Sequence, residues 1–139
     1  MNGKLTMTRD LLNQKLLALR AQLERGFSPE TAQFGQQGSR PGTGQCAAVT
    51  LIVRDIFGGE MVSARVQDES HWFNRLCVDE GVVDVDLTAD QFSETAVRVC
   101  QAGDLYPDTR IRRDSEVAEE TRRRSTLLRQ RAEIDLDAI

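Results

Sequence analysis

The stretch Gln45-Cys46-Ala47-Ala48-Val49-Thr50-Leu51-Ile52-Val53 begins the segment that decides the fold. Its apolar residues recur with the period of an α-helix and also cover most of the other faces. We therefore predict a buried helix from about residue 45 to residue 57, ended by Gly58-Gly59. Cys46 stands in the first turn, where the positive end of the helix dipole favours a thiolate over a thiol. The stretch thus predicts both the centre of the core and an activated sulfur at its edge.

A second helix is predicted from about residue 8 to residue 25. An apolar stripe indicates one buried face: it runs through Leu11, Lys15, Leu19 and Leu23, is flanked by Leu12 and Leu16, and has Lys15 at its edge. Gly26 suits the C′ position that ends such a helix. The connection that follows, from Phe27 to Gly44, is rich in polar residues and glycine and is long for a compact domain. We expect this loop to contact a substrate.

Three strand-like runs follow the buried helix, at residues 60–67, 70–78 and 82–87, and the last two form a hairpin. Mixed structure is expected to about residue 103, and Tyr106-Pro107-Asp108 breaks the chain. A charged helix is then predicted from about residue 115 to residue 132, capped by Ser115. These elements predict a single α+β domain over residues 1–139, with its core at about 27–105. A central helix packs on a small antiparallel sheet, flanked by the terminal helices.

Composition and charge exclude several classes of protein. Hydrophobic residues make up 40% of the chain and aromatic residues 5%, so the core is expected to be modest and aliphatic. A formal net charge of −4 predicts no binding to nucleic acid or to an anionic membrane. No apolar run approaches the roughly 20 residues of a membrane span. Arginine clusters at 110–113 and 122–124 lie beside glutamates, which favours solvated surfaces over phosphate binding.

The first residues of the chain and its cysteines indicate the cellular compartment. Residues 1–5 lack the continuous apolar segment of a signal peptide. Three cysteines without a C-x-x-C pair suit free thiols in a reducing compartment. We therefore expect a cytoplasmic protein, with secretion by a route without a cleaved signal as the open alternative.

The order Cys46, His71, Asp86 predicts the chemistry. His71 is the only histidine and begins a strand, which holds a side chain in the fixed direction that proton transfer requires. Asp84 and Asp86 lie on one face of the next strand, where either carboxylate could orient the imidazole. Asp86 is preferred because it ends the strand. This order is the one that nucleophilic catalysis by a cysteine needs.

Two alternatives use the same sulfur. Cys46 could be a small, inert core residue, as Cys77 and Cys100 are expected to be. The three cysteines and His71 could also form a Cys3His zinc site, but closely spaced ligand pairs are missing. We predict no metal and no cofactor.

Four motifs resemble the YunG-like family of small bacterial proteins. They are Gly44-Gln45-Cys46-Ala47-Ala48-Val49-Thr50, Phe57-Gly58-Gly59-Glu60, Ser70-His71-Trp72-Phe73-Asn74-Arg75 and Val85-Asp86-Leu87-Thr88-Ala89-Asp90-Gln91-Phe92. The resemblance covers about residues 40 to 95. The resemblance implies that the chain is related to this family, but it does not imply a particular reaction.

The same order is more distantly similar to transglutaminase-like and papain-like thiol enzymes. His71-Trp72 followed by Asp86-Leu87-Thr88 resembles their His-x-Trp…Asp-x-Thr pattern, although the aromatic residue here stands directly beside the histidine. The resemblance implies a papain-like or transglutaminase-like core, with Cys46 as nucleophile, His71 as base and Asp86 as the group that orients it.

The residue that holds the oxyanion is less well defined. Papain-like enzymes carry a glutamine several residues before the cysteine, whereas the sixth residue before Cys46 is Arg40. Gln45 and Trp72 are the candidate substrate or oxyanion residues, and Gln36 and Gln37 are further candidates.

The sequence therefore predicts a cysteine-dependent hydrolase or acyl transferase that acts on a protein or peptide amide, as a peptidase, deamidase or transamidase. The alternative is a non-catalytic protein-binding module that retains a papain-like fold. Such a module would recognise its partner through the loop at 27–44 and the arginine-bearing helix.

Overall fold

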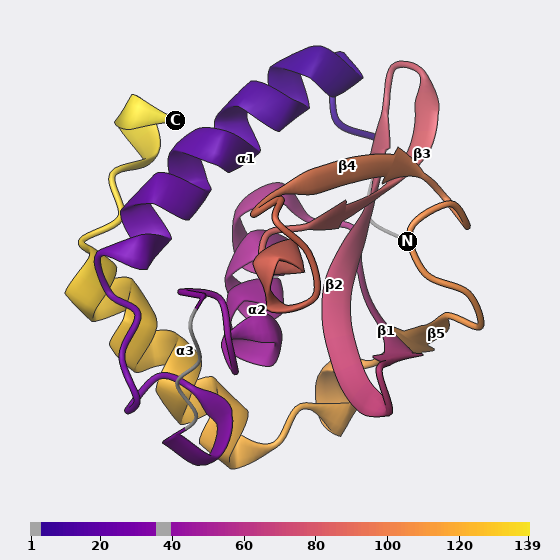
Figure 1. The fold of residues 1–139 in the computed structure, drawn as a ribbon. Helices are drawn as coiled ribbons and strands as arrows, with labels where there is room; N and C mark the ends of the chain where they lie inside the picture. Colours follow the sequence, from indigo (N-terminus) through magenta and orange to yellow (C-terminus); the bar gives the residue numbers. More distant parts are fainter. Residues whose placement is uncertain (1–3, 36–39) are drawn as a thin grey trace.

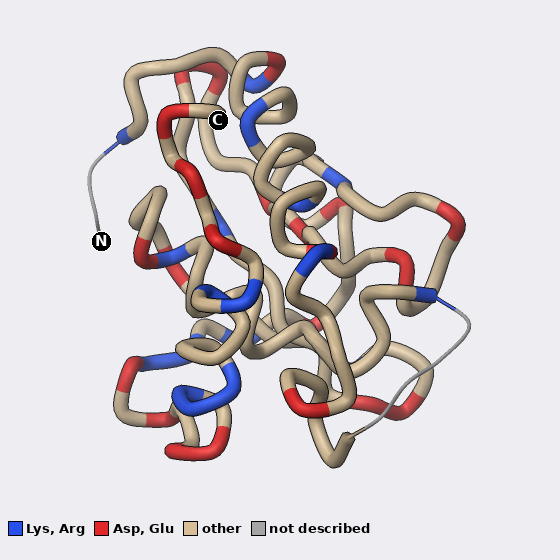
Figure 2. Tube along the Cα trace, turned by 90° about the vertical axis from the view of Figure 1, so that its left-hand side faces the viewer, with Lys and Arg blue, Asp and Glu red and all other residues tan. Residues whose placement is uncertain are grey.

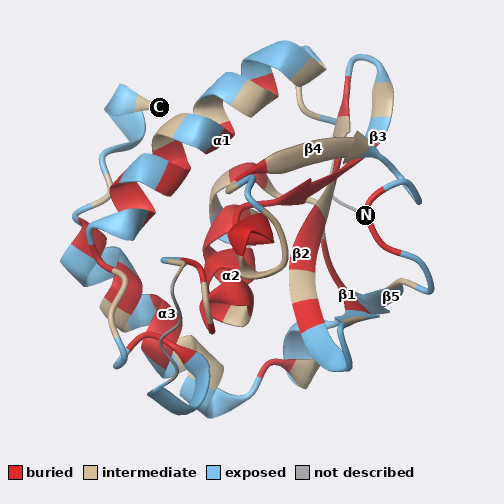
Figure 3. Cartoon of the chain, in the orientation of Figure 1, coloured by how far each residue is buried: buried red, intermediate tan, exposed pale blue. Residues whose placement is uncertain are grey.

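The computed structural model describes residues 4–35 and 40–139, and its centre is helix α2 (Cys46–Phe57). Figure 1 shows α2 between the sheet and the two outer helices, α1 (Arg9–Glu24) and α3 (Glu119–Ala132). Most residues of α2 are buried (Figure 3), because the helix packs against the sheet on one side and α3 on the other. The buried helix predicted from the apolar period is confirmed.

The sheet has five antiparallel strands in the order β4-β3-β2-β1-β5. They are β1 (Glu60–Val66), β2 (Glu69–Val78), β3 (Gly81–Asp86), β4 (Arg98–Gln101) and β5 (Arg110–Arg112). The first three match the predicted runs to within about one residue. The two edge strands are short and were not predicted, since three or four residues carry too little alternation to be recognised. Within the described residues, three α-helices and this open sheet confirm the α+β class.

Strand β2 is buried at His71 and Phe73 on one face and at Asn74 on the other. Side chains alternate along a strand, so His71 and Phe73 lie on one face and Trp72 and Asn74 on the other. The Asn74 amide donates to the Thr50 carbonyl of α2 at 2.9 Å, which shows that its face is turned toward α2. Phe73, on the face of His71, packs in a cluster with Val62, Ala64, Leu105 and Tyr106. The segment after β4 therefore covers the histidine.

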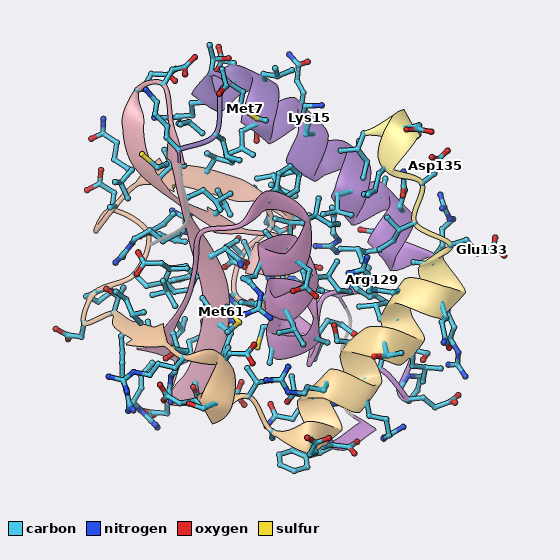
Figure 4. All side chains as sticks on the ribbon, turned by 180° about the vertical axis from the view of Figure 1, so that it is seen from behind. Met7, Lys15, Met61, Arg129, Glu133 and Asp135 are labelled. Carbon is cyan, nitrogen blue, oxygen red and sulfur yellow. The ribbon has the colours of Figure 1, made fainter. Side chains whose placement is uncertain are left out.

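Helix α1 buries only part of the predicted stripe. Leu19 and Leu23 are buried together with the flanking Leu12 and Leu16, whereas Leu11 is 42% exposed. Residues spaced by four throughout drift around a helix, but alternating spacings of four and three stay on one side. Lys15, labelled on α1 in Figure 4, lies outside the core as expected. Its ammonium donates to the Ile139 carbonyl at 3.0 Å.

The ends of the outer helices confirm one prediction and correct another. Gly26 follows the C-cap Arg25 and so takes the predicted C′ position, although without the left-handed conformation that is common there. A Cβ there would lie 2.8 Å from the Ala132 nitrogen, so glycine is needed for the close approach of α3. Ser115 does not cap α3, because it lies in the short 3-10 helix η3 (Asp114–Glu116) and Ala118 is the N-cap.

Charged residues of both signs are interleaved along the chain (Figure 2). Arg110 and Arg112 each pair with Glu116 at 3.1 Å, and Arg122 pairs with Asp114 at 2.9 Å. These arginines are neutralised as predicted. Arg124 differs, because it is buried rather than solvated. Among the described residues, no helix is both long and apolar enough to cross a membrane.

Candidate functional site

Cys46 is the first residue of α2 and lines a small cavity. Its side chain is 6% exposed, and the N–H groups of this first turn have no acceptor within the helix. The cavity has a volume of about 200 Å³. Its walls come from the loop before α2, the start of β2 and the segment after β3: Gln33, Phe34, Gly44, Cys46, Glu69, Ser70, Gln91 and Phe92. Part of the 27–44 loop therefore adjoins the sulfur.

His71 and Asp86 form a buried pair. Nε2 of His71 lies 2.7 Å from Oδ2 of Asp86, and both side chains are 1% exposed. The other ring nitrogen, Nδ1, is buried and has no hydrogen-bond partner of ordinary geometry among the described residues. The Cys46 thiol lies close enough to interact with this ring. Asp86 thus occupies one nitrogen and leaves the other for the sulfur.

Two further groups hold the Asp86 carboxylate. Tyr106 donates its phenol O–H to Oδ2 at 2.9 Å, and the Thr88 backbone N–H donates to Oδ1 at 3.0 Å. Burial and the nearby Asp86 charge raise the pKa of Tyr106, so it remains a donor. Charge-assisted bonds of this kind stabilise an ionised carboxylate. Tyr106 escaped the sequence analysis, where its one distinguishing signal was that it is the only tyrosine.

The pKa values of Cys46 and His71 shift in opposite directions. Burial raises the pKa of the Cys46 thiol, but interactions with the His71 ring and the Trp72 backbone N–H outweigh burial and hold the pKa below its usual value. Burial lowers the pKa of His71, while Asp86 and Cys46 outweigh it and raise the pKa to about 10. Both shifts favour a thiolate beside an imidazolium.

Aromatic rings fix the plane of the imidazole. Phe92 meets it edge-on with ring centres 4.9 Å apart, and Tyr106 does so at 5.4 Å. Phe92 also lines the Cys46 cavity, so the same ring contacts the histidine and that space. A ring held in this way can present Nδ1 in one direction only.

The loop before Cys46 is tied to distant parts of the chain through Asp90. This carboxylate binds the Arg20 guanidinium of α1 through two contacts of 2.9 Å and accepts the Gly42 N–H at 2.8 Å. A Cβ on Gly42 would lie 2.1 Å from Asp90 Oδ1. Gln91 accepts the Gly44 N–H at 3.0 Å. These contacts hold the start of α2 and were not foreseen from the sequence.

Gln45 and Trp72, the candidate oxyanion residues, face other partners. The Gln45 amide accepts from the Thr31 hydroxyl at 2.9 Å and donates to the Ser28 carbonyl at 3.2 Å. Trp72 packs its ring beside Met61, and the Arg112 guanidinium lies 5.4 Å from the ring centre. Only its backbone N–H adjoins the Cys46 thiol. The further candidates, Gln36 and Gln37, lie outside the described residues.

The remaining candidates lie away from the sulfur. Asp84 accepts two bonds from Arg75, at 2.7 and 3.1 Å, because the two residues are paired across β2 and β3. Cys77 and Cys100 are half-buried free thiols. Within the described part of the chain, no three His, Cys, Asp or Glu side chains are grouped to hold a metal ion. The Cys3His alternative is therefore not assembled.

Comparison with known proteins places the chain in a family. The family model described as YunG protein matches residues 15–137, so the chain belongs to the YunG family. A Bacillus subtilis (strain 168) relative, described as "Uncharacterized protein YunG", is 38% identical over 52 residues. That match covers 37% of this chain and 42% of the relative. No solved structure matches the chain, and the papain-like or transglutaminase-like core stays a prediction.

Proposed function

We propose that this member of the YunG family is a cysteine-dependent hydrolase or acyl transferase that acts on an amide bond of a protein or peptide. The proposal is carried by the chain of contacts from Asp86 through His71 to Cys46. Asp86 binds Nε2 of His71 at 2.7 Å, and Nδ1 remains for the thiol. An orienting carboxylate, a base and a nucleophile in this relation are what thiol catalysis requires.

The first half of the reaction forms an acyl-enzyme. The Cys46 thiolate attacks the amide carbonyl carbon, and the carbonyl oxygen becomes an oxyanion. The unpaired N–H groups in the first turn of α2 are the donors that we assign to this oxyanion. His71 then gives its Nδ1 proton to the amide nitrogen, the C–N bond breaks, and an amine or ammonia leaves. The acyl group remains on Cys46 as a thioester.

The second half regenerates the sulfur. Water gives a proton to His71 Nδ1 and attacks the thioester carbonyl, so that the C–S bond breaks and a carboxylic acid is released. An amine in place of water would produce a new amide. Hydrolysis, deamidation and transamidation thus share every residue, and they differ only in the leaving group and the acceptor.

The order of residues supports the proposal through its likeness to papain-like and transglutaminase-like enzymes. In those enzymes a cysteine opens a helix, a histidine lies on a strand, and an aspartate or asparagine follows on the next. This chain departs from the papain-like pattern at the oxyanion glutamine, since Gln45 binds Thr31 and Ser28 instead. We therefore assign the oxyanion to backbone donors alone.

Phe34 supports a substrate-contacting role for the loop. It lies at the rim of the Cys46 cavity, is 88% exposed and has a φ of 54°. A bulky side chain in the left-handed region is strained, and such strain is concentrated at functional sites. An aromatic ring held in solvent beside a nucleophile is suited to pack against a bound peptide.

A non-catalytic protein-binding module is the second candidate. The observation in its favour is the burial of the nucleophile and the base, because Cys46 is 6% and His71 1% exposed. In that case Phe34 and its loop would contact a partner, and the buried polar pair would only stabilise the fold.

Alkylation by iodoacetamide over a range of pH tests the proposal. We expect Cys46 to react with a midpoint below the usual value of about 8.5, while Cys77 and Cys100 serve as reference thiols in the same chain. Peptide mapping assigns each site, and Cys46→Ala identifies the Cys46 signal. In parallel, wild type and Cys46→Ala are compared on peptide amides and glutamine-containing peptides. A Cys46 midpoint equal to that of the reference thiols, with no turnover, would favour the binding module.

A further inference from the structure

Arg124 of α3 is a buried cation with incomplete partners. Its side chain is only 4% exposed. One terminal nitrogen donates to the Thr31 carbonyl at 3.3 Å and the other to the Thr121 hydroxyl at 3.0 Å. Its Nε is buried and without a partner among the described residues. Two of the five N–H donors of an arginine are thus in use.

No carboxylate in the described chain forms an ion pair with Arg124, although its neighbours are all paired. Arg123 binds Glu120, the acid whose charge also acts on Arg124. The stretches 1–3 and 36–39 contain no aspartate or glutamate, so they cannot supply the missing charge either. A guanidinium that is buried without a counter-anion destabilises the fold. Burial accordingly lowers the pKa of Arg124.

Arg124 lines a cavity of about 550 Å³ between the 29–35 loop and the start of α3. Ala118, the N-cap of this 14-residue helix, lies in its wall without a side-chain cap. The positive end of the helix therefore adds to the charge of Arg124. The other charged groups of the wall are already paired, Glu30 with Arg131 at 2.7 Å and Glu120 with Arg123. Arg124 is therefore the charged group of this wall that has no ion pair, although the charges of Glu120 and of a Cys46 thiolate act on it from a distance.

This cavity adjoins the Cys46 cavity. Gln33 and Phe34 line both, so a ligand that crosses the exposed Phe34 ring can reach the two spaces at once. The nucleophile and Arg124 thus line two cavities that share Gln33 and Phe34 in their walls.

We propose that the Arg124 cavity binds a carboxylate of the amide substrate. The inference rests on the proposed function and names its substrate class: a peptide that carries a carboxylate, from an acidic side chain or a free C-terminus, beside the amide that Cys46 attacks. Arg124 and the start of α3 bind the carboxylate, and Phe34 packs against the intervening backbone. Arg124 is then a specificity residue rather than part of the reacting pair.

Binding of matched peptides tests this inference without turnover. The Cys46→Ala chain is titrated with three acetylated peptides. The first is alanine–glutamine–alanine with a free C-terminal carboxylate, the second is its neutral C-terminal amide, and the third is an amidated peptide that ends in glutamate. We expect at least one acidic peptide to bind about tenfold or more tightly than the neutral amide, the discrimination of a charged hydrogen bond. Which of the two acidic peptides binds more tightly distinguishes a C-terminal from a side-chain carboxylate. Arg124→Met is expected to remove the difference, and Arg123→Met, which changes an exposed and paired arginine, to keep it.

Protection of Cys46 in the wild-type chain is a second measurement that does not depend on the folding of Arg124→Met. An acidic peptide should slow alkylation of Cys46 at a concentration about tenfold lower than its neutral amide does. Equal affinity and equal protection by charged and neutral peptides would overturn the inference, as would equal effects of the two arginine substitutions. A reactive Cys46 without carboxylate preference would reject this inference alone. Carboxylate preference with an ordinary Cys46 thiol would reject the catalytic proposal and keep the binding site.

Discussion

Replacement of Asp86 by asparagine separates the charge of the carboxylate from its shape. Asparagine has nearly the same size, but its single carbonyl oxygen can accept from either Tyr106 or the Thr88 N–H and not from both, because these two donors bind different oxygens of Asp86. The negative charge opposite His71 is lost, although it lies 2.7 Å from Nε2 in a site with almost no solvent. Burial, which lowers the pKa of His71, would then be opposed by Cys46 alone. The imidazole should become neutral near pH 7, and the Cys46 thiolate should lose its counter-charge.

The size of the effect follows from the bond that is removed. A hydrogen bond between a charged donor and acceptor is worth about 1.5–3 kcal/mol, which corresponds to roughly a 10- to 100-fold change in an equilibrium. We expect the alkylation rate of Cys46 near pH 7 to fall by that factor and its midpoint to move up in pH. Loss of one member of a buried pair should also cost about 3 kcal/mol of unfolding free energy.

Asp84→Asn is the matched control. Asp84 is a buried carboxylate on the same strand face, and it binds Arg75 rather than His71. Both variants are compared by iodoacetamide alkylation of Cys46 from about pH 5 to pH 10 and by urea unfolding. The control should lose stability and keep the Cys46 profile. If Asp86→Asn leaves the Cys46 midpoint in place, or if both variants move it equally, the coupling of Asp86 to the sulfur through His71 is refuted.

Three further predictions concern the surroundings of the pair. Tyr106→Phe removes one donor to Asp86 and should lower the free energy of unfolding in urea by about 1 kcal/mol. It should shift the pH midpoint of Cys46 alkylation less than Asp86→Asn does, and an equal shift would contradict this prediction. Gly42→Ala puts a Cβ 2.1 Å from an Asp90 oxygen, so it should lower the free energy of unfolding by about 2 kcal/mol and slow the alkylation of Cys46. A variant as stable and as reactive as wild type would show that the loop can move to accommodate the extra carbon. The pKa of His71 is raised from 6.5 to about 10 in the folded chain, so protonation of His71 stabilises the fold fully below about pH 6.5 and progressively less as the pH rises through 10. The difference in unfolding free energy between wild type and His71→Gln should therefore shrink over that range. A constant difference would argue against the raised pKa.

Elements with long local patterns could be predicted from the sequence. The apolar run after Cys46 predicted α2 to within one residue, and alternation predicted the first three strands. The same reasoning failed for β4 and β5, which are too short to show a period. It also centred the buried face of α1 on Leu11 and Lys15 and left Leu12 and Leu16 at its flank, because it could not tell which side of the helix the rest of the core would cover.

The candidate site was predictable in its members and not in its surroundings. The single histidine left His71 as the only partner for a cysteine. The choice between Asp84 and Asp86 depended on strand register, which sets Arg75 opposite Asp84 and leaves Asp86 to His71. Tyr106, 20 residues from Asp86, was missed because no local pattern connects the two.

The sequence by itself determined the buried helix, the α+β class and the order of the sulfur, the imidazole and the carboxylate, because hydrophobic period and residue type are local properties. Only the tertiary structure decided that Gln45 faces Thr31, that Asp90 ties Arg20 to Gly42 and that Arg124 is buried without an acid partner. These contacts join segments that are far apart along the chain. They depend on register, helix rotation and close packing, which a sequence pattern of a few residues does not specify.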